Sequence, residues 1–406
     1  MEKAKIDWPH MHPINGVRIG AARAGIKKPG RLDVLIFEIA KGASVAGVFT
    51  QNAFCAAPVM VAKEHLSLGD IRYLLINSGN ANACTGERGL IDARATCTAV
   101  GDLGGVSAPQ VLPFSTGVIG EFLPVDKIIG AVPEAINALD KDGWESAARA
   151  IMTTDTCPKG ASLQFEYQGK TLSVSGVAKG AGMIRPNMAT MLSFVATDAV
   201  VAQSVLDTIL NIAVNRSFNR ITIDGDTSTN DACILIASGE AELPPIEQAE
   251  GELFEKLCDA VVVVMQQLAH AIVRDGEGAT KFVSIEVCGG FDSDECLKIG
   301  YSVAHSPLVK TALYASDANW GRIVAAIGYA GIRNIDVTKI KVWLDDVLVV
   351  DRGSRYAGYS DDAGTAVVKR PDFTIKIELG RGRASETVWT SDLSHDYVTI
   401  NAEYRT

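Results

Sequence analysis

Residues 179–193 place a lysine, a pair of glycines and a hydroxyl residue in an order suited to nucleophilic catalysis. Lys179 begins a Gly-Ala-Gly turn, and a Pro-Asn pair then leads to Ala189, Thr190 and an apolar strand. If strained backbone lets the Thr190 hydroxyl attack the peptide bond before it, cleavage leaves Thr190 with a free α-amino group. Such an amine titrates at about pH 7.7 to 8.0 and would act as the general base for the hydroxyl of the same residue. A plain junction between a loop and a strand is the alternative interpretation.

Two other segments combine glycine with polar side chains. Residues 77–86 read Asn-Ser-Gly-Asn-Ala-Asn-Ala-Cys-Thr-Gly and follow a predicted strand, and residues 115–120 read Ser-Thr-Gly-Val-Ile-Gly. Side-chain amides, hydroxyls and backbone N–H groups in such segments can line a ligand site. Asparagine and glycine also form ordinary turns, because both tolerate left-handed backbone, so a structural role is the alternative in each case.

The elements that must position these residues are predicted from the spacing of apolar side chains. Alternating or short apolar runs predict strands over residues 32–40, 57–62, 74–76, 191–196, 233–237, 282–287, 373–379 and 397–401. Helical spacing predicts helices over residues 124–139, 143–152, 202–218 and 252–273, and hairpins are expected with turns at 168–169 and 345–346. Strands and helices come in runs, which predicts an α+β fold with mostly antiparallel or mixed sheets. No linker or repeat marks a domain boundary.

Composition excludes several classes of protein. The 406 residues carry 38 Lys+Arg and 48 Asp+Glu, a net charge of -10, and show no lysine or arginine cluster, which argues against nucleic acid or an anionic membrane as partner. Small anionic substrates remain possible if a local site is basic. No apolar run reaches the roughly 18 to 20 residues of a membrane span, and residues 260–273 are interrupted by Gln266, Gln267 and His270, so we expect a buried or amphipathic helix there.

Common catalytic and metal motifs are missing from the sequence. It contains no phosphate loop, no G-x-S-x-G elbow and no H-E-x-x-H helix. The eight cysteines form no C-x-x-C pair, and the six histidines are scattered, so neither a metal site nor a Ser/His triad is expected. Reduced thiols in a cytoplasmic protein are the expectation.

Residues 179–192 resemble the signature of the ornithine acetyltransferase family of arginine biosynthesis, whose members cleave themselves before the threonine of an Ala-Thr-Met-Leu stretch. The similarity extends along the whole chain. Eight further segments match the family in the expected order: residues 49–52, 77–86, 115–120, 152–155, 217–231, 275–281, 317–322 and 400–406.

The resemblance implies a ping-pong acetyl transfer. Thr190, freed by cleavage after Ala189, would attack the acetyl group of N2-acetylornithine, release ornithine and hold the acetyl group as an ester until glutamate accepts it. Thr116, through its hydroxyl, and Gly117, through its backbone N–H, match the family's oxyanion hole. The positions that match its substrate-binding residues are Thr153, Lys179, Glu277, Asn401 and Thr406.

Charge suggests how these residues would hold an amino acid. Lys179 can pair with the α-carboxylate, and Glu277 can meet the side-chain ammonium of ornithine. Thr154 is as reactive as Thr153, so the choice between these two threonines stays open.

The resemblance also implies an assembly and a second donor. We expect an alpha chain of residues 1–189 and a beta chain of residues 190–406, intertwined in one layered α/β sandwich, and a heterotetramer of two alpha and two beta chains. We expect no bound cofactor and no metal, with acetyl-CoA as a second acetyl donor. A member of the family that only recycles acetyl from N2-acetylornithine is the alternative for the donor. Two alternatives remain for the function: a self-cleaving hydrolase or aminopeptidase of related fold, and a non-catalytic binding or assembly protein that retains the fold.

Overall fold

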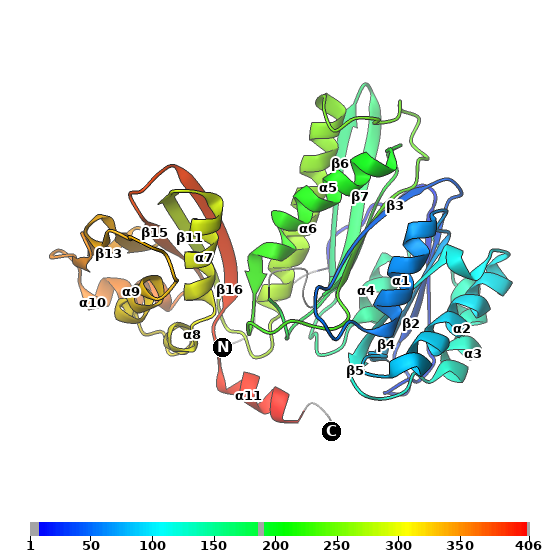
Figure 1. The fold of residues 1–406 in the computed structure, drawn as a ribbon, viewed down its shortest axis with the longest axis horizontal. Helices are drawn as coiled ribbons and strands as arrows, with labels where there is room; N and C mark the ends of the chain where they lie inside the picture. Colours follow the sequence, from blue (N-terminus) through cyan, green and yellow to red (C-terminus); the bar gives the residue numbers. More distant parts are fainter. Residues whose placement is uncertain (1–7, 186–190, 404–406) are drawn as a thin grey trace. The chain divides into compact units, whose positions relative to one another are not determined.

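The computed structural model describes residues 8–185 and 191–403, and these fall into two compact units (Figure 1). Within the described part, the larger unit comprises residues 8–219 and 226–272, and the smaller unit comprises residues 220–225 and 273–403. The larger unit combines helices with two sheets of mixed strand direction, and the smaller unit combines helices with one such sheet. The expected α+β class is therefore confirmed.

Two mixed sheets form the centre of the larger unit. In the four-stranded sheet, of order β1-β2-β4-β5, β4 and β5 are parallel and the other neighbours antiparallel. In the five-stranded sheet, of order β3-β10-β8-β7-β6, β10 and β8 are the parallel pair. The strands are β1 (Val17–Ala22), β2 (Val34–Ile39), β3 (Ser44–Phe49), β4 (Tyr73–Asn80), β5 (Val111–Val118), β6 (Lys159–Tyr167), β7 (Lys170–Lys179), β8 (Leu192–Thr197) and β10 (Ala232–Ala237).

A single apolar core joins the two sheets because alternate side chains of each strand point to opposite faces. The ring of Phe194 in β8 lies 5.5 Å from that of Phe37 in β2 and 5.1 Å from that of Phe114 in β5. Val34 and Ile36 of β2 point to the opposite face from Phe37, and their side chains belong to a second core there. Burial of one such side chain contributes roughly 1.5 to 3 kcal/mol, so the alternation holds the sheets face to face.

Helices cover the outer faces of both sheets. Helices α2 (Gly86–Gly104) and α3 (Val125–Asn137) share the second core with the four-stranded sheet, and α5 (Gln203–Asn215) and α6 (Glu252–Arg274) lie against the five-stranded sheet (Figure 1). Helix α4 (Trp144–Ile151) packs Trp144 into the core between the sheets. The larger unit is thus the layered sandwich that was expected.

Helix α6 is long and apolar enough, by length and composition alone, to cross a membrane, and 61% of its most apolar 18 residues are buried inside the protein. A buried helix in the core of a protein can have the same length and apolar composition. Here Leu268 lies so close to the sheet that a Cβ on Gly176 of β7 would come within 3.3 Å of its Cδ1. The predicted buried or amphipathic helix is therefore confirmed.

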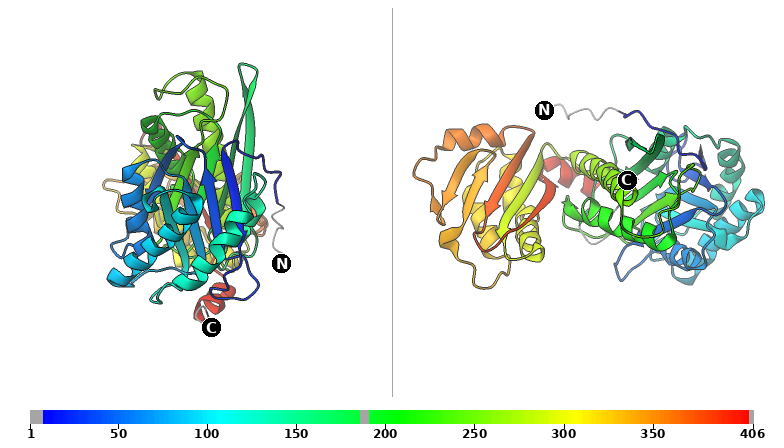
Figure 2. Two further views of the ribbon diagram at one scale, coloured as in Figure 1. Left: turned by 90° about the vertical axis from the view of Figure 1, so that its right-hand side faces the viewer. Right: turned by 90° about the horizontal axis from the view of Figure 1, so that it is seen from above.

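The first predicted hairpin is β6 and β7. Gln168 and Gly169 both have positive φ, +50° and +75°, which is the backbone that a two-residue turn between antiparallel strands needs. Only the second half of β7, from Val174 to Lys179, also pairs with β8. The outer part of the hairpin consequently extends past the rest of the sheet (Figure 2).

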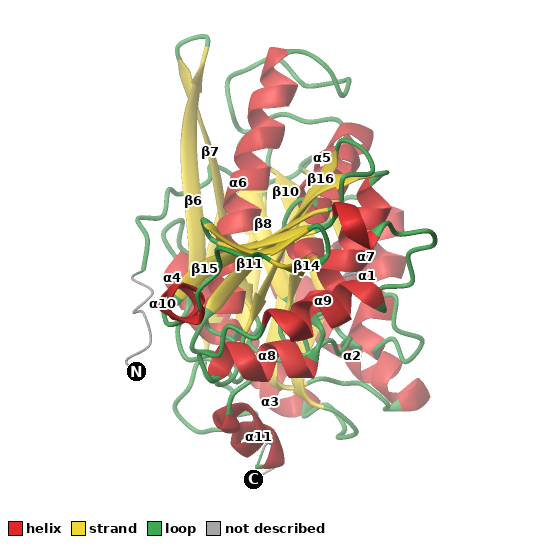
Figure 3. Cartoon of the chain, turned by 90° about the vertical axis from the view of Figure 1, so that its left-hand side faces the viewer, coloured by secondary structure: helices red, strands yellow, loops and turns green. Residues whose placement is uncertain are grey.

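The smaller unit is built on a seven-stranded sheet of order β14-β13-β12-β15-β11-β16-β9. Figure 3 labels strands β11, β14, β15 and β16 of this sheet. Val283, Ile285 and Val287 of β11 share one core with four helices, which cover that face of the sheet. The strands are β9 (Ile221–Thr222), β11 (Phe282–Gly290), β12 (Lys341–Leu344), β13 (Val347–Asp351), β14 (Ser354–Arg355), β15 (Asp372–Glu378) and β16 (Ala384–Ser391); the helices are α7 (Ser293–Ala304), α8 (Pro307–Tyr314), α9 (Trp320–Gly328) and α10 (Asp361–Val368).

Two predicted strands are wrong. Residues 57–62 belong to helix α1 (Ala57–Leu68), where Pro58 occupies the first turn, a position that proline favours because its missing N–H is not needed there. Residues 397–401 belong to helix α11 (His395–Ala402), although they include three β-branched residues. Ser394 caps this helix by accepting a hydrogen bond from the Tyr397 N–H at 3.3 Å, and this local cap outweighs the strand propensity.

Candidate functional site

Thr116 and Gly117 lie near the end of β5, beside the end of β4. Their register partners are Ser78 and Gly79, so the two polar segments singled out in the sequence run side by side as strands. Thr116 is buried. The interpretation of both segments as turns is therefore wrong for their first residues, which belong to the paired strands β4 and β5.

Gly117 occupies a backbone conformation that only glycine adopts easily. Its φ is +136°, and a Cβ there would come within 2.3 Å of the Gly79 carbonyl carbon and 2.6 Å of the Asn80 nitrogen. Because these contacts are with backbone, no side-chain movement relieves them. The close approach of Gly117 to Gly79 fixes the direction of the peptide N–H groups at this strand end.

Buried amides hold the two strand ends together. Ser115 donates its hydroxyl hydrogen to Asn77 Oδ1 at 2.6 Å. Asn230, from the loop before β10, donates through Nδ2 to the Ala81 carbonyl at 2.6 Å and to the Ser115 carbonyl at 2.9 Å. Since the Asn230 side chain is buried and uses both N–H groups, it positions the residue directly before Thr116.

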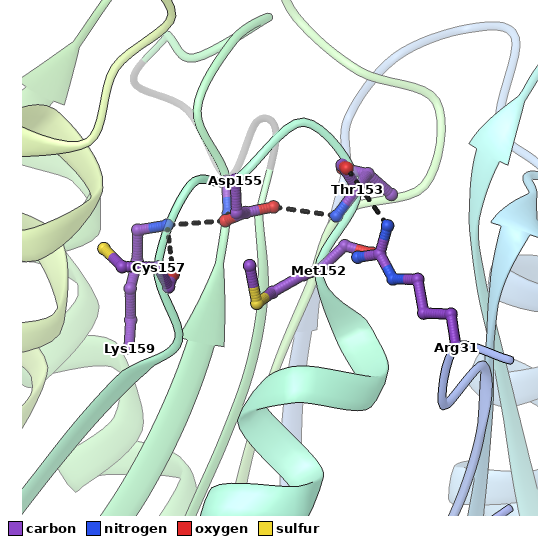
Figure 4. A network of polar contacts seen from close by, with 7 residues as sticks. Arg31, Met152, Thr153, Asp155, Cys157 and Lys159 are labelled. Carbon is purple, nitrogen blue, oxygen red and sulfur yellow. Dashed lines mark hydrogen bonds and ion pairs between the residues drawn. The ribbon is translucent and has the colours of Figure 1, made fainter. Parts of the chain in front are cut away.

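Helix α4 brings Thr153 to the same end of the sheet. Ser78 donates its hydroxyl hydrogen to the Ala150 carbonyl at 2.7 Å, which ties the last turn of α4 to β4. The Arg31 guanidinium donates to the Met152 carbonyl and, at 3.4 Å, to the Thr153 carbonyl (Figure 4). Thr153 follows the helix directly, and these contacts fix its backbone from two sides.

A buried carboxylate, Asp155, organises the residues after α4 (Figure 4). Its Oδ2 accepts the Thr153 N–H at 2.9 Å, and its Oδ1 accepts from Lys159 Nζ at 2.6 Å and from the Gly180 N–H at 2.7 Å. The side chains of Asp155 and Lys159 are 1% and 0% exposed. One carboxylate thus connects the segment of Thr153 with the glycine that follows Lys179.

The charge on Asp155 is stabilised by two lysines. Burial alone would raise the pKa of this carboxyl, but the positive charges of Lys159 and Lys179 and the hydrogen bonds from Lys159 and Thr153 outweigh burial and hold the pKa below its ordinary value. Asp155 is therefore ionised throughout the neutral range. The structure brings Thr153 and Lys179 together around it.

Lys179 is buried at the last position of β7. It pairs with Leu192, the first residue of β8, which follows the predicted nucleophile by two positions in the sequence. The predicted nucleophile Thr190, the predicted cleavage partner Ala189 and the predicted substrate residue Thr406 lie outside the described residues. Their roles stay predictions.

The other two predicted substrate residues lie in the smaller unit. Asn401 in α11 donates through Nδ2 to Glu277 Oε2 at 2.8 Å, so the structure brings these two residues together across 124 positions of sequence. Glu277 is buried and Asn401 is exposed. The pair therefore presents a fixed carboxylate with one oxygen already oriented by an amide.

The segment of Glu277 is anchored by Asp392. Asp392 Oδ1 accepts the backbone N–H groups of Thr280 at 2.8 Å and Lys281 at 3.0 Å. Lys310 lies nearby and donates to Thr390 Oγ1 at 3.0 Å. Burial lowers the pKa of Lys310 to about 8, although the carboxylates of Asp392 and Asp224 oppose this.

The sequence alone gives no sign of the roles of several of these residues. Asp155 stands in a segment that matched the family, and Lys159 follows it by four positions, but a buried ion pair between them has no signature in the spacing. Ser78 and Asn230 stand in matching segments too, without any pattern that shows which carbonyl each would hold. Within residues 8–185 and 191–403, no group of three or more His, Cys, Asp or Glu side chains is placed to hold a metal ion.

Comparison with known proteins identifies the family. The family model described as the ArgJ family matches residues 18–406. A relative from Pseudomonas syringae pv. tomato, "Arginine biosynthesis bifunctional protein ArgJ", is 60% identical over 398 residues, which cover 98% of each chain. The protein of the same name from Methylococcus capsulatus is 59% identical over 97% of this chain and 96% of its own.

Solved structures are similar over parts of the chain. The Bacillus halodurans protein named argJ is 38% identical, with a TM-score of 0.49, over 52% of this chain and 97% of that chain. The two relatives are named as bifunctional proteins of arginine biosynthesis. It belongs to the ArgJ family, and the family resemblance of the sequence motifs is confirmed.

Proposed function

We propose that the protein transfers the acetyl group of N2-acetylornithine to glutamate and also acetylates glutamate from acetyl-CoA. Membership of a family whose matched relatives are named bifunctional supports two reactions. The observation that carries the proposal for this chain is the buried cluster around Asp155, which joins Thr153 to the lysine at the start of the Lys-Gly-Ala-Gly segment.

In this proposal Thr190 acts as the nucleophile because cleavage of the bond before it leaves its α-amine free. The free α-amine takes the proton of the hydroxyl as the Thr190 oxygen attacks the acetyl carbonyl, and the proton then passes to the departing amine of ornithine. The developing oxyanion needs donors fixed in advance. Thr116 and Gly117 suit this role because the close approach of Gly117 to Gly79 holds that strand end in one conformation.

Substrate recognition uses charges of both signs. Lys179 would pair with the α-carboxylate of either amino acid, and Asp155 holds the backbone beside it. Glu277, oriented by Asn401, would accept the side-chain ammonium of ornithine. Thr153 is favoured over Thr154 because its N–H and its carbonyl both have fixed partners.

The proposed assembly extends the sequence expectation. We propose that cleavage produces chains 1–189 and 190–406, which remain in one protomer, and that two protomers form a cytoplasmic heterotetramer. The five-stranded sheet supports a shared protomer, because β8 and β10 lie between β3 and β7. Native mass spectrometry of the purified protein would report two copies of each chain.

The first test is the intact mass of the protein under denaturing conditions, with Thr190→Ala as control. Two fragments that meet at the Ala189–Thr190 bond in the wild type, and one full-length chain in the variant, are the expected result. A single uncleaved species in the wild type would remove the amine that activates Thr190 and favour the non-catalytic protein.

A second assay separates transfer from hydrolysis. Ornithine release from N2-acetylornithine should depend on added glutamate, with N-acetylglutamate formed in equal amount. Release at the same rate without glutamate would favour the self-cleaving hydrolase or aminopeptidase.

A further inference from the structure

The loop between β1 and β2 carries four cations within nine residues: Arg23, Lys27, Lys28 and Arg31. The first three are exposed, and Arg31 is partly buried. These four residues form a cluster of lysine and arginine, so the expectation that the chain has no such cluster is wrong here. It stands out because the whole protein carries a net charge of -10.

The loop is built to keep its positive charge at the surface. Asp33, the acidic residue at its end, is buried, and its two oxygens accept the N–H groups of Ala24 and Ile26, each at 2.6 Å. Arg23 Nε donates to the Gly30 carbonyl at 3.0 Å, which closes the loop on itself. Lys127 of α3 adds another cation, because its Nζ donates to the Gly25 carbonyl at 2.8 Å.

The same loop borders the candidate site at two points. A Cβ on Gly79 would lie 3.1 Å from Ile26 Cγ2 and 3.2 Å from Lys27 Cβ, so Lys27 packs directly against the partner of Gly117. At the other end, Arg31 holds the carbonyl of Thr153. Cations therefore lie beside both the predicted oxyanion hole and a predicted substrate residue.

A cluster of this kind suits a ligand with several negative charges outside its reacting group. N2-acetylornithine and glutamate carry carboxylates, which the site itself would hold. Acetyl-CoA carries a pyrophosphate and a 3′-phosphate at the far end of a flexible arm. Exposed lysine and arginine side chains attract such groups over distances near the Debye length and bind them by charge-assisted hydrogen bonds.

We propose that the β1–β2 loop, residues 23–31, binds the phosphates of a coenzyme A thioester while its acyl group reaches Thr190. This rests on the proposed function. In the step itself, the Thr190 oxygen forms the new ester bond and the carbon–sulfur bond breaks. The hydroxyl proton passes through the α-amine to the leaving thiolate, which departs as the free thiol of coenzyme A.

The test compares two donors on one enzyme. The variant Lys27→Gln/Lys28→Gln removes two exposed charges and keeps the aliphatic stems. It should raise the KM for acetyl-CoA by about ten-fold, with the KM for N2-acetylornithine within about two-fold of wild type. Added salt should raise the KM for acetyl-CoA more in the wild type than in the variant.

A matched control is Lys41→Gln/Lys141→Gln, which makes the same change of charge at exposed lysines outside the loop. Lys41 lies beyond the opposite end of β2. This control should leave both KM values near those of the wild type. The reaction with N2-acetylornithine also shows whether each variant is folded.

Three outcomes would overturn the proposal: an unchanged KM for acetyl-CoA in the loop variant, an equal rise for both donors, or an equal rise in the control. A wild-type enzyme that uses N2-acetylornithine but not acetyl-CoA would also overturn it, while leaving the proposed exchange reaction intact. If the wild type shows no exchange with glutamate, the proposed function itself fails and this inference fails with it.

Discussion

Asp155→Asn is the substitution that most directly tests the buried cluster. The asparagine has the same shape, but it loses the charge that compensates Lys159. Its NH2 group would face either the Thr153 N–H or the Lys159 ammonium and Gly180 N–H together, and all of these are donors. Removing one partner of a fully buried ion pair costs about 3 to 5 kcal/mol, because the other charge stays buried. For a unit of this size, that is a fall in the unfolding midpoint of roughly 6 to 20 °C.

The pH dependence of this loss follows from the lowered pKa of Asp155. A carboxyl whose folded pKa lies below its ordinary value of 3.8 gives its full stabilisation above that ordinary value, and loses it as the pH falls through the folded value. The difference between wild type and variant should therefore be constant between about pH 6 and 9 and shrink only in acid.

Differential scanning calorimetry of the cleaved protein measures the effect, and a second variant separates charge from shape. In Asp155→Asn/Lys159→Met the uncompensated charge is removed, so the double variant should be more stable than Asp155→Asn alone. A midpoint within about 2 °C of wild type for Asp155→Asn, or a double variant less stable than the single one, would refute this account of the cluster.

Three further predictions concern Gly117, Asn230 and Lys310. Gly117→Ala should lower the rate of acetyl transfer at least about 100-fold in the glutamate-dependent assay, because the new Cβ would meet the Gly79 backbone. The control Gly130→Ala, which places a Cβ in open space on α3, should retain activity. Asn230→Asp should lower kcat roughly ten-fold or more with little change in KM, because a carboxylate cannot donate to the two carbonyls that the amide holds; an unchanged kcat would contradict this. Lys310 has a pKa lowered to about 8, so between that value and the ordinary 10.5 the unfolded state binds more protons than the folded state. The stability of the wild type, measured by calorimetry relative to Lys310→Met, should therefore rise with pH across this range. A difference in stability that stays constant with pH would exclude the lowered pKa.

The spacing of apolar residues correctly predicted those helices and strands for which the local sequence and the tertiary packing favour the same structure. The hairpin turn at Gln168 and Gly169 and the long helix α6 were found because turn residues and helical spacing coincide with the observed burial. Helices α1 and α11 were missed because a short apolar run and three β-branched residues read as strands. In both helices the deciding feature is one residue at the first turn, Pro58 or Ser394.

The candidate site was less accessible to sequence reasoning, because its geometry depends on contacts between distant segments. Thr153 and Lys179 meet through Asp155, and Glu277 meets Asn401, over separations that no periodic pattern spans. Family resemblance singled out these four residues. It did not show that a buried ion pair positions two of them, because burial of charge becomes visible only when the surrounding strands are in place.

The order of the five-stranded sheet has a consequence for how the halves of the chain can be produced. Strands β8 and β10, which follow residue 190, pair with each other and fill the space between β3 and β7, which precede residue 189. Expressed alone, residues 190–406 would carry this two-stranded ribbon with both edges open, and open edges recruit other chains into aggregates. A gene divided at this position should therefore yield usable protein only when both fragments are made together.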